Sequence, residues 1–263
     1  MRIVVISPNK YSFYSLAVIE SILSERLELV GVFYLKFSIR RILFEAKKSP
    51  ILIFNKFWQK VLFRQKLYRT LDSGADLLSY RKQIGGDLKS ISDLENGNIM
   101  IQSFDDFNSN DCLASLKYLK PDLVLFTGGG ILKTEFLEIP TIGVLNAHMG
   151  ILPEYRGMHV AEWAYLKNDY SNIGCSTHLM EKNVDTGKVI DVRYISYEHI
   201  YHYNELYTIF EKNMCISLVN SCKLLKQNPQ FKKFISPITP LYFTMPKKLL
   251  NIVKLKIKTN SKK

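Results

Sequence analysis

Short apolar runs alternate with segments of helical periodicity along most of the chain. Runs at residues 2–7 (RIVVIS) and 28–35 (ELVGVFYL) flank a helical pattern near residues 16–24. Continuous apolar runs of this length are typical of strands that are covered on both faces. The order of strand, helix and strand therefore predicts the opening of a parallel α/β sheet.

The alternation resumes at about residue 98, and a long helical pattern follows His202. Two runs, at 174–180 and 188–197, predict a pair of strands joined by a turn. The other predicted elements are strands at 98–103, 122–127 and 141–146 and helices at 110–120, starting at Asn110 or Asp111, and at 131–139. Five strands threaded by helices predict an α/β fold with a Rossmann-like, doubly wound and mostly parallel sheet.

A basic segment from residue 36 to about 92 interrupts this pattern. Apolar residues between 54 and 62 recur at helical spacing, which predicts an amphipathic helix in an insertion. We expect one main domain over residues 1–205 that contains this helical insertion. Residues 206–263 are expected to add a C-terminal helix and a basic tail, and not a full separate domain.

The formal net charge of +12 is concentrated in two segments. Residues 36–69 hold ten Lys or Arg against one Glu, and residues 247–263 hold seven Lys and no acidic residue. The remainder of the chain is mildly acidic. Such basic segments suit a solvated helix face, a diphosphate, an RNA or an anionic membrane surface, and charge alone leaves these alternatives open.

Hydropathy and cysteine use predict a soluble, cytoplasmic protein. No apolar run approaches the ~18 residues needed to span a bilayer, so no transmembrane segment is expected, and the chain opens directly with a strand pattern. The four cysteines form no Cys-x-x-Cys pair and have no histidine at zinc-ligand spacing. We therefore expect buried thiols and no metal site.

Two common nucleotide sites are excluded by the sequence. The loop after the first strand contains no glycine, as a dinucleotide site would require, and no Walker loop is present. Gly128 to Gly130 lie between a predicted strand and a predicted helix, where free backbone N–H groups can face a ligand. Glycines are equally common at such turns for steric reasons, so this run alone does not define a site.

Asn146 and His148 stand two apart at the end of a predicted strand, in the stretch NAHMGILPEYRG. Side chains two apart on a strand project to the same side. The carboxyl ends of strands are also where open α/β sheets bind ligands. By itself the pair fits both a catalytic site and a hydrogen-bonded strand end.

The sequence around this pair resembles the folate-dependent formyltransferase family. VLNAHMGILPEYRG at residues 144–157 is followed by GCSTHLMEKNVDTGKVI at residues 174–190. These stretches match the family's Asn-x-His, its Leu-Pro-x-Tyr-Arg-Gly-like turn and its Asp-Thr-Gly-like loop. The resemblance covers residues 98–197 well and the first 34 residues loosely. It implies a formyltransferase fold with the catalytic domain in residues 1–205.

The resemblance implies that Asn146, His148 and Asp185 are the catalytic residues. Formyl transfer passes an HC=O group from a folate nitrogen to an amine through a tetrahedral intermediate with a developing oxyanion. The Asn146 amide can donate to this oxyanion, and His148 can donate to it or move a proton to the leaving nitrogen. Asp185 is the candidate for accepting the amine proton or holding a water, and it can orient His148 or raise its pKa.

The resemblance also implies a formyl donor, N10-formyltetrahydrofolate, and implies no metal. In related enzymes the pterin ring lies against two loops, one after the strand before Asn-x-His and one leading to the catalytic Asp. The matching residues, expected to bind the cofactor, are Gly130, Ile131, Leu132, Asn183 and Val184.

The sequence defines the residues that bind the amine acceptor less well. Asn9 and Lys10 follow the first strand and face the same end of the sheet, so they are candidates for contact with a phosphate or sugar. A lysine in a polar loop is, however, usually only solvated. Arg156 is expected to pin its turn, Trp163 to lie in the core and His178 to have a structural role.

The expected acceptor is a small-molecule amine, namely a nucleotide-diphospho amino sugar used for surface polysaccharide such as a lipopolysaccharide O-antigen. Purine-pathway members of the family usually have Asp-Gly-Gly where this chain has Asp185-Thr186-Gly187. Methionyl-tRNA formyltransferase shares Asp-Thr-Gly but normally adds a C-terminal β-barrel, for which residues 206–263 are too short. Two alternatives stay open: a methionyl-tRNA formyltransferase without that barrel, and a basic RNA- or membrane-binding protein on a vestigial transferase fold.

Overall fold

The computed structural model gives the arrangement of most of the chain. The described residues are 1–36, 75–94, 98–198, 200 and 202–260. The amphipathic helix expected between residues 54 and 62 lies outside them.

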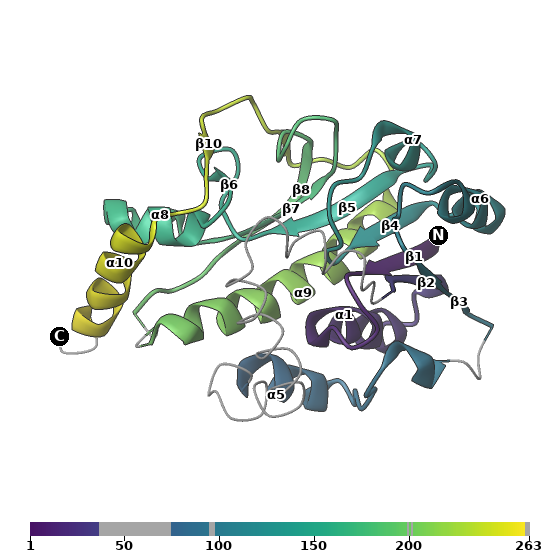
Figure 1. The fold of residues 1–263 in the computed structure, drawn as a ribbon, viewed down its shortest axis with the longest axis horizontal. Coiled ribbons are helices and arrows are strands. Elements are labelled where there is room, and N and C mark those ends of the chain that lie inside the picture. The colour runs from purple at the N-terminus through teal and green to yellow at the C-terminus, as the bar shows by residue number, and fades with distance from the viewer. Residues whose placement is uncertain (37–74, 95–97, 199, 201, 261–263) are drawn as a thin grey trace, which may run out of the picture.

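An eight-stranded sheet runs through the molecule (Figure 1). Its strands are β1 (Arg2–Ser7), β2 (Glu28–Leu35), β3 (Met100–Phe104), β4 (Leu123–Phe126), β5 (Gly143–His148), β7 (Gly174–Leu179), β8 (Lys188–Tyr194) and β9 (Phe234–Ile235). Their order in the sheet is β3-β2-β1-β4-β5-β7-β8-β9. The first five are mutually parallel and the last three pair antiparallel. The predicted doubly wound, mostly parallel α/β sheet is therefore confirmed.

Helices cover both faces of this sheet. They are α1 (Phe13–Ser24), α5 (Ala75–Gln83), α6 (Asn110–Leu119), α7 (Thr134–Leu137), α8 (Val160–Lys167), α9 (Tyr203–Gln227) and α10 (Lys247–Asn260), with 3-10 turns η2 (Ile91–Leu94) and η3 (Tyr170–Asn172). Helix α6 begins at Asn110, one of the two predicted starts, because the Ser109 hydroxyl accepts a hydrogen bond from the Cys112 N–H.

Successive residues of β1 are buried on opposite faces of the sheet. Ile3 and Val5 belong to the core cluster under α1 and α9, whereas Val4 and Ile6 belong to the cluster under α6 and α7. A strand covered on both faces must be apolar at every position. This explains why RIVVIS shows no alternation of polar and apolar residues.

The C-terminal region packs onto the sheet instead of standing apart from it. Phe210 and Leu218 of α9 are fully buried in the core that α9 shares with β5, β7 and α1. The division of the chain at residue 205 stays a prediction. The expected basic tail is largely helical, since Lys247–Asn260 form α10, which packs against α8.

A second, two-stranded parallel sheet joins distant parts of the chain. It pairs β6 (Arg156–Gly157) with β10 (Leu241–Tyr242). The pairing carries the segment after α9 across to the loop that follows β5. Figure 1 shows β6, β10, α8 and α10 gathered at one end of the molecule.

A buried ion pair links α1 to α5. Arg81 donates from Nε and Nη2 to the two carboxylate oxygens of Glu20, each at 2.6 Å. Its Nη2 also donates to the carbonyl of Leu88, whose N–H donates to Glu20. Both charged side chains are buried, so each depends on the other for compensation of its lost hydration.

We expect Arg81→Met to lower the free energy of unfolding by about 3–5 kcal/mol, because it leaves the Glu20 carboxylate buried without its partner. Chemical denaturation measures this change. The double variant Glu20→Leu with Arg81→Met should be more stable than Arg81→Met alone. Breaking the exposed Lys223–Glu25 pair with Lys223→Met is the matched control and should cost less than about 1 kcal/mol. Equal effects at Arg81 and Lys223 would contradict this account.

Candidate active site

The sheet fixes the position of Asn146 and His148. Both lie in the last three residues of β5, at the carboxyl ends of the parallel strands, where Asn146 is level with Phe126 of β4. Asn146 is half-buried and His148 is buried. As predicted, the pair is at the edge where open α/β sheets bind ligands.

Strand β7 brings a second histidine to this edge. Because β7 is antiparallel to β5, His178 pairs directly with Asn146. Its Nε2 lies 3.2 Å from Nδ2 of Asn146 and 3.4 Å from Oδ1 of Asp185. His178 is thus between two of the three predicted catalytic side chains, a position beyond the structural role expected for it.

The tautomer of neutral His148 follows from its surroundings. Its Nε2 lies 2.7 Å from the carbonyl oxygen of Tyr155, and a carbonyl can only accept, so Nε2 carries the proton. Nδ1 is then unprotonated in the neutral ring and lies 3.6 Å from Oδ2 of Asp185. His148 therefore has one ring nitrogen available for proton transfer.

Asp185 reaches the two histidines from a tightly folded loop. Its backbone is left-handed, with φ of 53°, a conformation that aspartate adopts more readily than most residues. Two positions later, a Cβ on Gly187 would lie 1.8 Å from the carbonyl oxygen of Leu179. Glycine is therefore required there, which gives the Asp-Thr-Gly sequence a steric reason.

The Asp185 carboxylate is buried but ionised. Burial raises its pKa, yet the hydrogen bond from His178, the charges of His148 and His178 and the N–H of Gly157 at 2.9 Å together lower it to about 2. For His148, in contrast, burial has a larger effect on the pKa than the neighbouring charges and hydrogen bonds. Burial lowers its pKa, and the Asp185 charge and the bond to Tyr155 offset only part of that shift. The expected raising effect of Asp185 is present but is outweighed.

The loop after β4 has an exposed, glycine-rich backbone. Gly128, Gly129 and Gly130 all have positive φ, and the side chain of Ile131 is 88% exposed. Leu132, in contrast, is buried in the core cluster under α6 and α7. Of these predicted cofactor residues, Gly130 and Ile131 face solvent and Leu132 anchors the loop.

Asn108 holds this loop in place, and sequence reasoning did not identify it. Its Nδ2 donates to the carbonyl of Ile131 at 2.9 Å, and its Oδ1 accepts from the N–H of Lys133 at 2.7 Å. The residue comes from the loop after β3, at the far edge of the parallel strands. Only the strand order, which the sequence pattern does not give, brings it to Ile131.

The loop before Asp185 is exposed and is tied to β6. Asn183 and Val184 are both exposed. The carbonyl of Val184 accepts two hydrogen bonds from the guanidinium of Arg156, which also donates to the carbonyl of Thr239. Arg156 thus pins its turn, as predicted, and joins it to the segment before β10.

Asn9 and Lys10 lie at the same end of the sheet as the catalytic residues, after β1. The Asn9 side chain accepts from the Tyr11 N–H at 2.8 Å, and Lys10 Nζ lies 5.6 Å from the centre of the Tyr11 ring. Strand β4 stands between β1 and β5. Contact of this pair with a substrate therefore stays a prediction.

Trp163 has the packing role that was expected, at the edge of the core. It lies on α8, its ring centre is 5.6 Å from that of Tyr242, and its Nε1 donates to the carbonyl of Phe243. These contacts hold the segment before α10 against α8.

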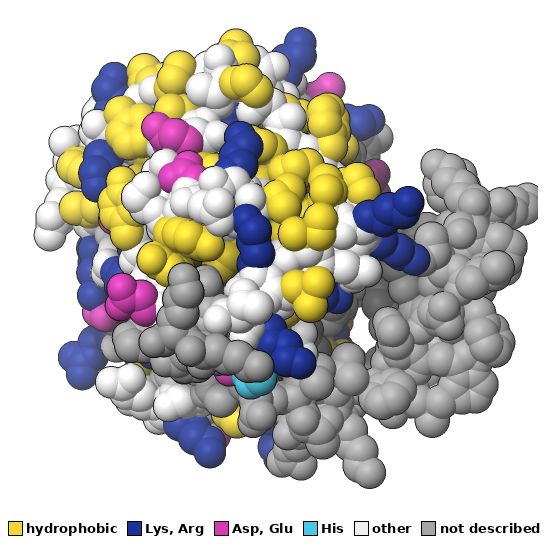
Figure 2. Space-filling view, turned by 90° about the vertical axis from the view of Figure 1, so that its left-hand side faces the viewer, with side chains coloured by type: hydrophobic (Ala, Val, Ile, Leu, Met, Phe, Trp, Pro, Cys, Tyr) yellow, Lys and Arg dark blue, Asp and Glu magenta, His cyan; other side chains and the backbone are white. Residues whose placement is uncertain are grey.

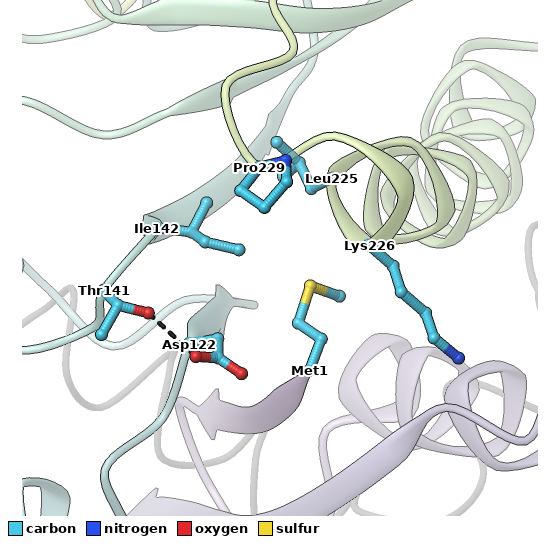
Figure 3. A pocket seen from close by; sticks show the side chains of 7 residues that line it. All are labelled: Met1, Asp122, Thr141, Ile142, Leu225, Lys226 and Pro229. Carbon is cyan, nitrogen blue, oxygen red and sulfur yellow. Dashed lines mark hydrogen bonds between the residues drawn. The ribbon is translucent and has the colours of Figure 1, made fainter.

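A separate cavity of about 300 Å³ lies at the opposite end of the strands. Figure 3 shows it between the start of β1, the loop before β5 and the end of α9, with Met1, Asp122, Ile142 and Lys226 among its lining residues. The Asp122 carboxylate accepts hydrogen bonds there from the Thr141 hydroxyl and the Arg2 N–H. The cavity is thus separate from the Asn146, His148 and Asp185 cluster.

The part of the chain that holds this cluster is similar to a known sequence family. Residues 95–219 match the sequence profile of the family described as formyl transferase. Methionyl-tRNA formyltransferase of Clostridium beijerinckii is 39% identical over 84 residues, which cover 32% of this chain and 27% of that protein. The enzyme of the same name from Caldanaerobacter subterraneus is 37% identical over 92 residues, which cover 35% and 29%. The match thus spans less than a third of these relatives.

Solved structures share the fold over a longer stretch. Glycinamide ribonucleotide transformylase 1 from Symbiobacterium toebii superposes with a TM-score of 0.54 at 14% identity, covering 86% of this chain and 88% of that one. A sugar N-formyltransferase from Shewanella superposes with a TM-score of 0.53 at 14% identity, covering 98% and 87%. Residues 95–219, which hold Asn146, His148 and Asp185, are thus similar in sequence to the formyl transferase family, and the chain shares the fold of these solved structures.

Proposed function

We propose that the protein transfers a formyl group from N10-formyltetrahydrofolate to the primary amine of a nucleotide-linked amino sugar, in a pathway that builds surface polysaccharide. The observation that carries the proposal is the convergence of Asn146, His148 and Asp185 at the carboxyl end of β5. An amide donor, an available imidazole nitrogen and an ionised carboxylate are the groups that formyl transfer needs.

Asn146 stabilises the oxyanion in this mechanism. Its amide lies against His178, with Nδ2 3.2 Å from Nε2, and can donate a hydrogen bond to the oxygen of the tetrahedral intermediate. A donor held in place before the reaction needs no reorganisation when the charge develops. His178 supplies that fixation.

His148 moves the proton. Its unprotonated Nδ1 accepts a proton from the attacking amine and passes it to the leaving folate nitrogen. The ring becomes an imidazolium in between, and the Asp185 carboxylate, 3.6 Å away, stabilises that charge. Since the pKa of Asp185 is lowered to about 2, this carboxylate is a poor proton acceptor. An orienting and charge-stabilising role is therefore favoured over a role as the base.

We expect Asn146→Ala, His148→Ala and Asp185→Asn each to lower kcat of formyl transfer by about 100 to 1,000 fold, because each removes a group that acts on developing charge. Steady-state turnover with saturating formyl donor measures the change. Asn110→Ala, an exposed asparagine on α6, is the matched control and should retain full activity. Near-normal turnover in any of the three site variants, with the fold intact by circular dichroism, would remove that residue from the mechanism.

Asn108→Ala should raise KM for the formyl donor about tenfold and leave kcat within a factor of about two. The substitution removes two hydrogen bonds that hold the Ile131 to Lys133 backbone, each worth about 1 kcal/mol, and does not touch the reacting atoms. Donor titration at saturating acceptor gives both constants, and Asn110→Ala again serves as the control. A fall in kcat with KM unchanged would argue against a donor-positioning role.

The residues after α9 favour a sugar amine over tRNA as acceptor. The part of them that the structure describes forms β9, β10 and α10, which pack back onto β8, β6 and α8. This arrangement differs from the C-terminal β-barrel that methionyl-tRNA formyltransferases normally add.

The acceptor is identified by a turnover panel. We expect deformylation of N10-formyltetrahydrofolate in the presence of one or more nucleotide-diphospho amino sugars and no turnover with methionyl initiator tRNA. The same sugars without the amine group are the controls. Turnover with methionyl initiator tRNA and with none of the sugars would favour a methionyl-tRNA formyltransferase. Salt-sensitive RNA binding without turnover of any amine would favour an RNA-binding protein without transferase activity.

A further inference from the structure

The C-terminal segment of the chain is rich in positive charge. Residues 228–263 contain nine lysines and no Asp, Glu, Arg or His. This segment therefore contributes +9 to the chain's net charge of +12, as much as residues 36–69 do. The sequence analysis left open which polyanion it would meet, and formyl transfer does not use it.

Helix α10 has a clear inner side. Val253 and Ile257 are fully buried, and Lys256 Nζ donates to the carbonyl of Leu166 and to Oδ1 of Asn168, both at 2.8 Å. These contacts fix the rotation of the helix about its axis. The opposite side must therefore face outward.

The outer side combines apolar and basic side chains. Ile252 is 44% exposed and Leu255 is 63% exposed, and exposed Lys248 continues the same stripe at helical spacing. Just before the helix, Phe243 is 72% exposed. We call Phe243, Lys248, Ile252 and Leu255 the α10 surface.

Figure 2 looks at the end of the molecule where α10, α8 and β10 lie. Hydrophobic and basic side chains are interspersed on this face, and acidic ones are few. Ile252 and Leu255 are neighbours on one side of the helix. Contiguous exposed apolar side chains, unlike single scattered ones, mark a surface that meets a partner, and the adjacent lysines require a partner that accepts both.

A lipid surface fits this combination better than two other partners. A nucleic acid would use the lysines but would leave Ile252 and Leu255 without a partner, because phosphates and sugars offer no apolar layer. A second copy of the chain would bring another lysine-rich α10 against the first. An anionic bilayer attracts the lysines through its surface potential and takes aliphatic side chains into the boundary of its acyl layer.

We infer that the α10 surface docks the protein on an anionic phospholipid membrane. The helix lies in the plane of the membrane surface, with Ile252, Leu255 and Phe243 entering the headgroup boundary and Lys247 and Lys248 near the lipid phosphates. No helix of the described residues has the length and apolar character to cross a bilayer, so this contact is peripheral. The inference goes beyond the proposed function and is independent of the acceptor.

Vesicle sedimentation of the full chain tests the inference. We expect binding to phosphatidylcholine vesicles that contain phosphatidylglycerol, at least tenfold weaker binding to phosphatidylcholine alone, and weakening with added salt. Ile252→Ser with Leu255→Ser should reduce affinity for the anionic vesicles at least tenfold, as should Lys247→Glu with Lys248→Glu. Tyr118→Ser and the pair Lys117→Glu, Lys120→Glu are exposed changes on α6 or directly after it. They lie far from α10 in Figure 1 and should have no effect.

Three outcomes would overturn the inference. The first is no binding of the wild-type chain to anionic vesicles, and the second is equal loss in the α6 and α10 variants. The third is that the Ile252 and Leu255 changes leave vesicle binding intact and instead abolish either self-association, measured by sedimentation velocity, or RNA binding. The assay requires no turnover. Its failure therefore leaves the proposed formyl transfer standing, and loss of turnover in the site variants leaves membrane docking untouched.

Discussion

The antiparallel pairing of β5 with β7 is the constraint on which the site depends. It sets Asn146 opposite His178 and His148 opposite Ser176, and it starts the loop that returns Asp185 to both histidines. The parallel half of the sheet supplies only Asn146 and His148, at a strand end. A shift of this register by one residue would turn His178 to the other face of the sheet and would separate the carboxylate from its partners.

Burial of the resulting cluster sets its chemistry. A buried carboxylate is costly unless donors surround it, and Asp185 has them in His178 and the Gly157 N–H. The compensated carboxylate stays ionised, while neighbouring His148 is pushed towards its neutral form by the same burial. A neutral imidazole beside a fixed negative charge is poised to take up a proton and to hold it. Both pKa values are lowered, which leaves a charged carboxylate beside a neutral imidazole. For the proposed formyl transfer, this favours His148 as the group that moves the proton and Asp185 as the group that stabilises its charge.

The sequence predicted those helices and strands whose pattern of apolar and polar residues lies within the element itself. Apolar runs predicted the strands, and the spacing of Asn146 and His148 predicted their shared side and their place at the strand end. The positions of Asn108 and His178 were not predictable in this way, since each depends on strand order or antiparallel register. The α10 helix was missed because three prolines between residues 237 and 246 and a lysine-rich composition resemble a disordered tail. Its burial of Val253 and Ile257 against α8 supplies the stability that the local pattern does not show.

The loop that carries Asp185 and the C-terminal helix α10 are parts of one packed unit. Arg156 joins the loop before Asp185 to Thr239, β6 pairs with β10, and the Met245 N–H donates to Nδ1 of His159 at the start of α8. The chain between β9 and α10 thus contacts both the Asp185 loop and the helix that packs under α10. Because hydrogen bonds and ring packing fix this segment at several points, the orientation of the α10 surface and that of the Asp185 loop are set by the same contacts.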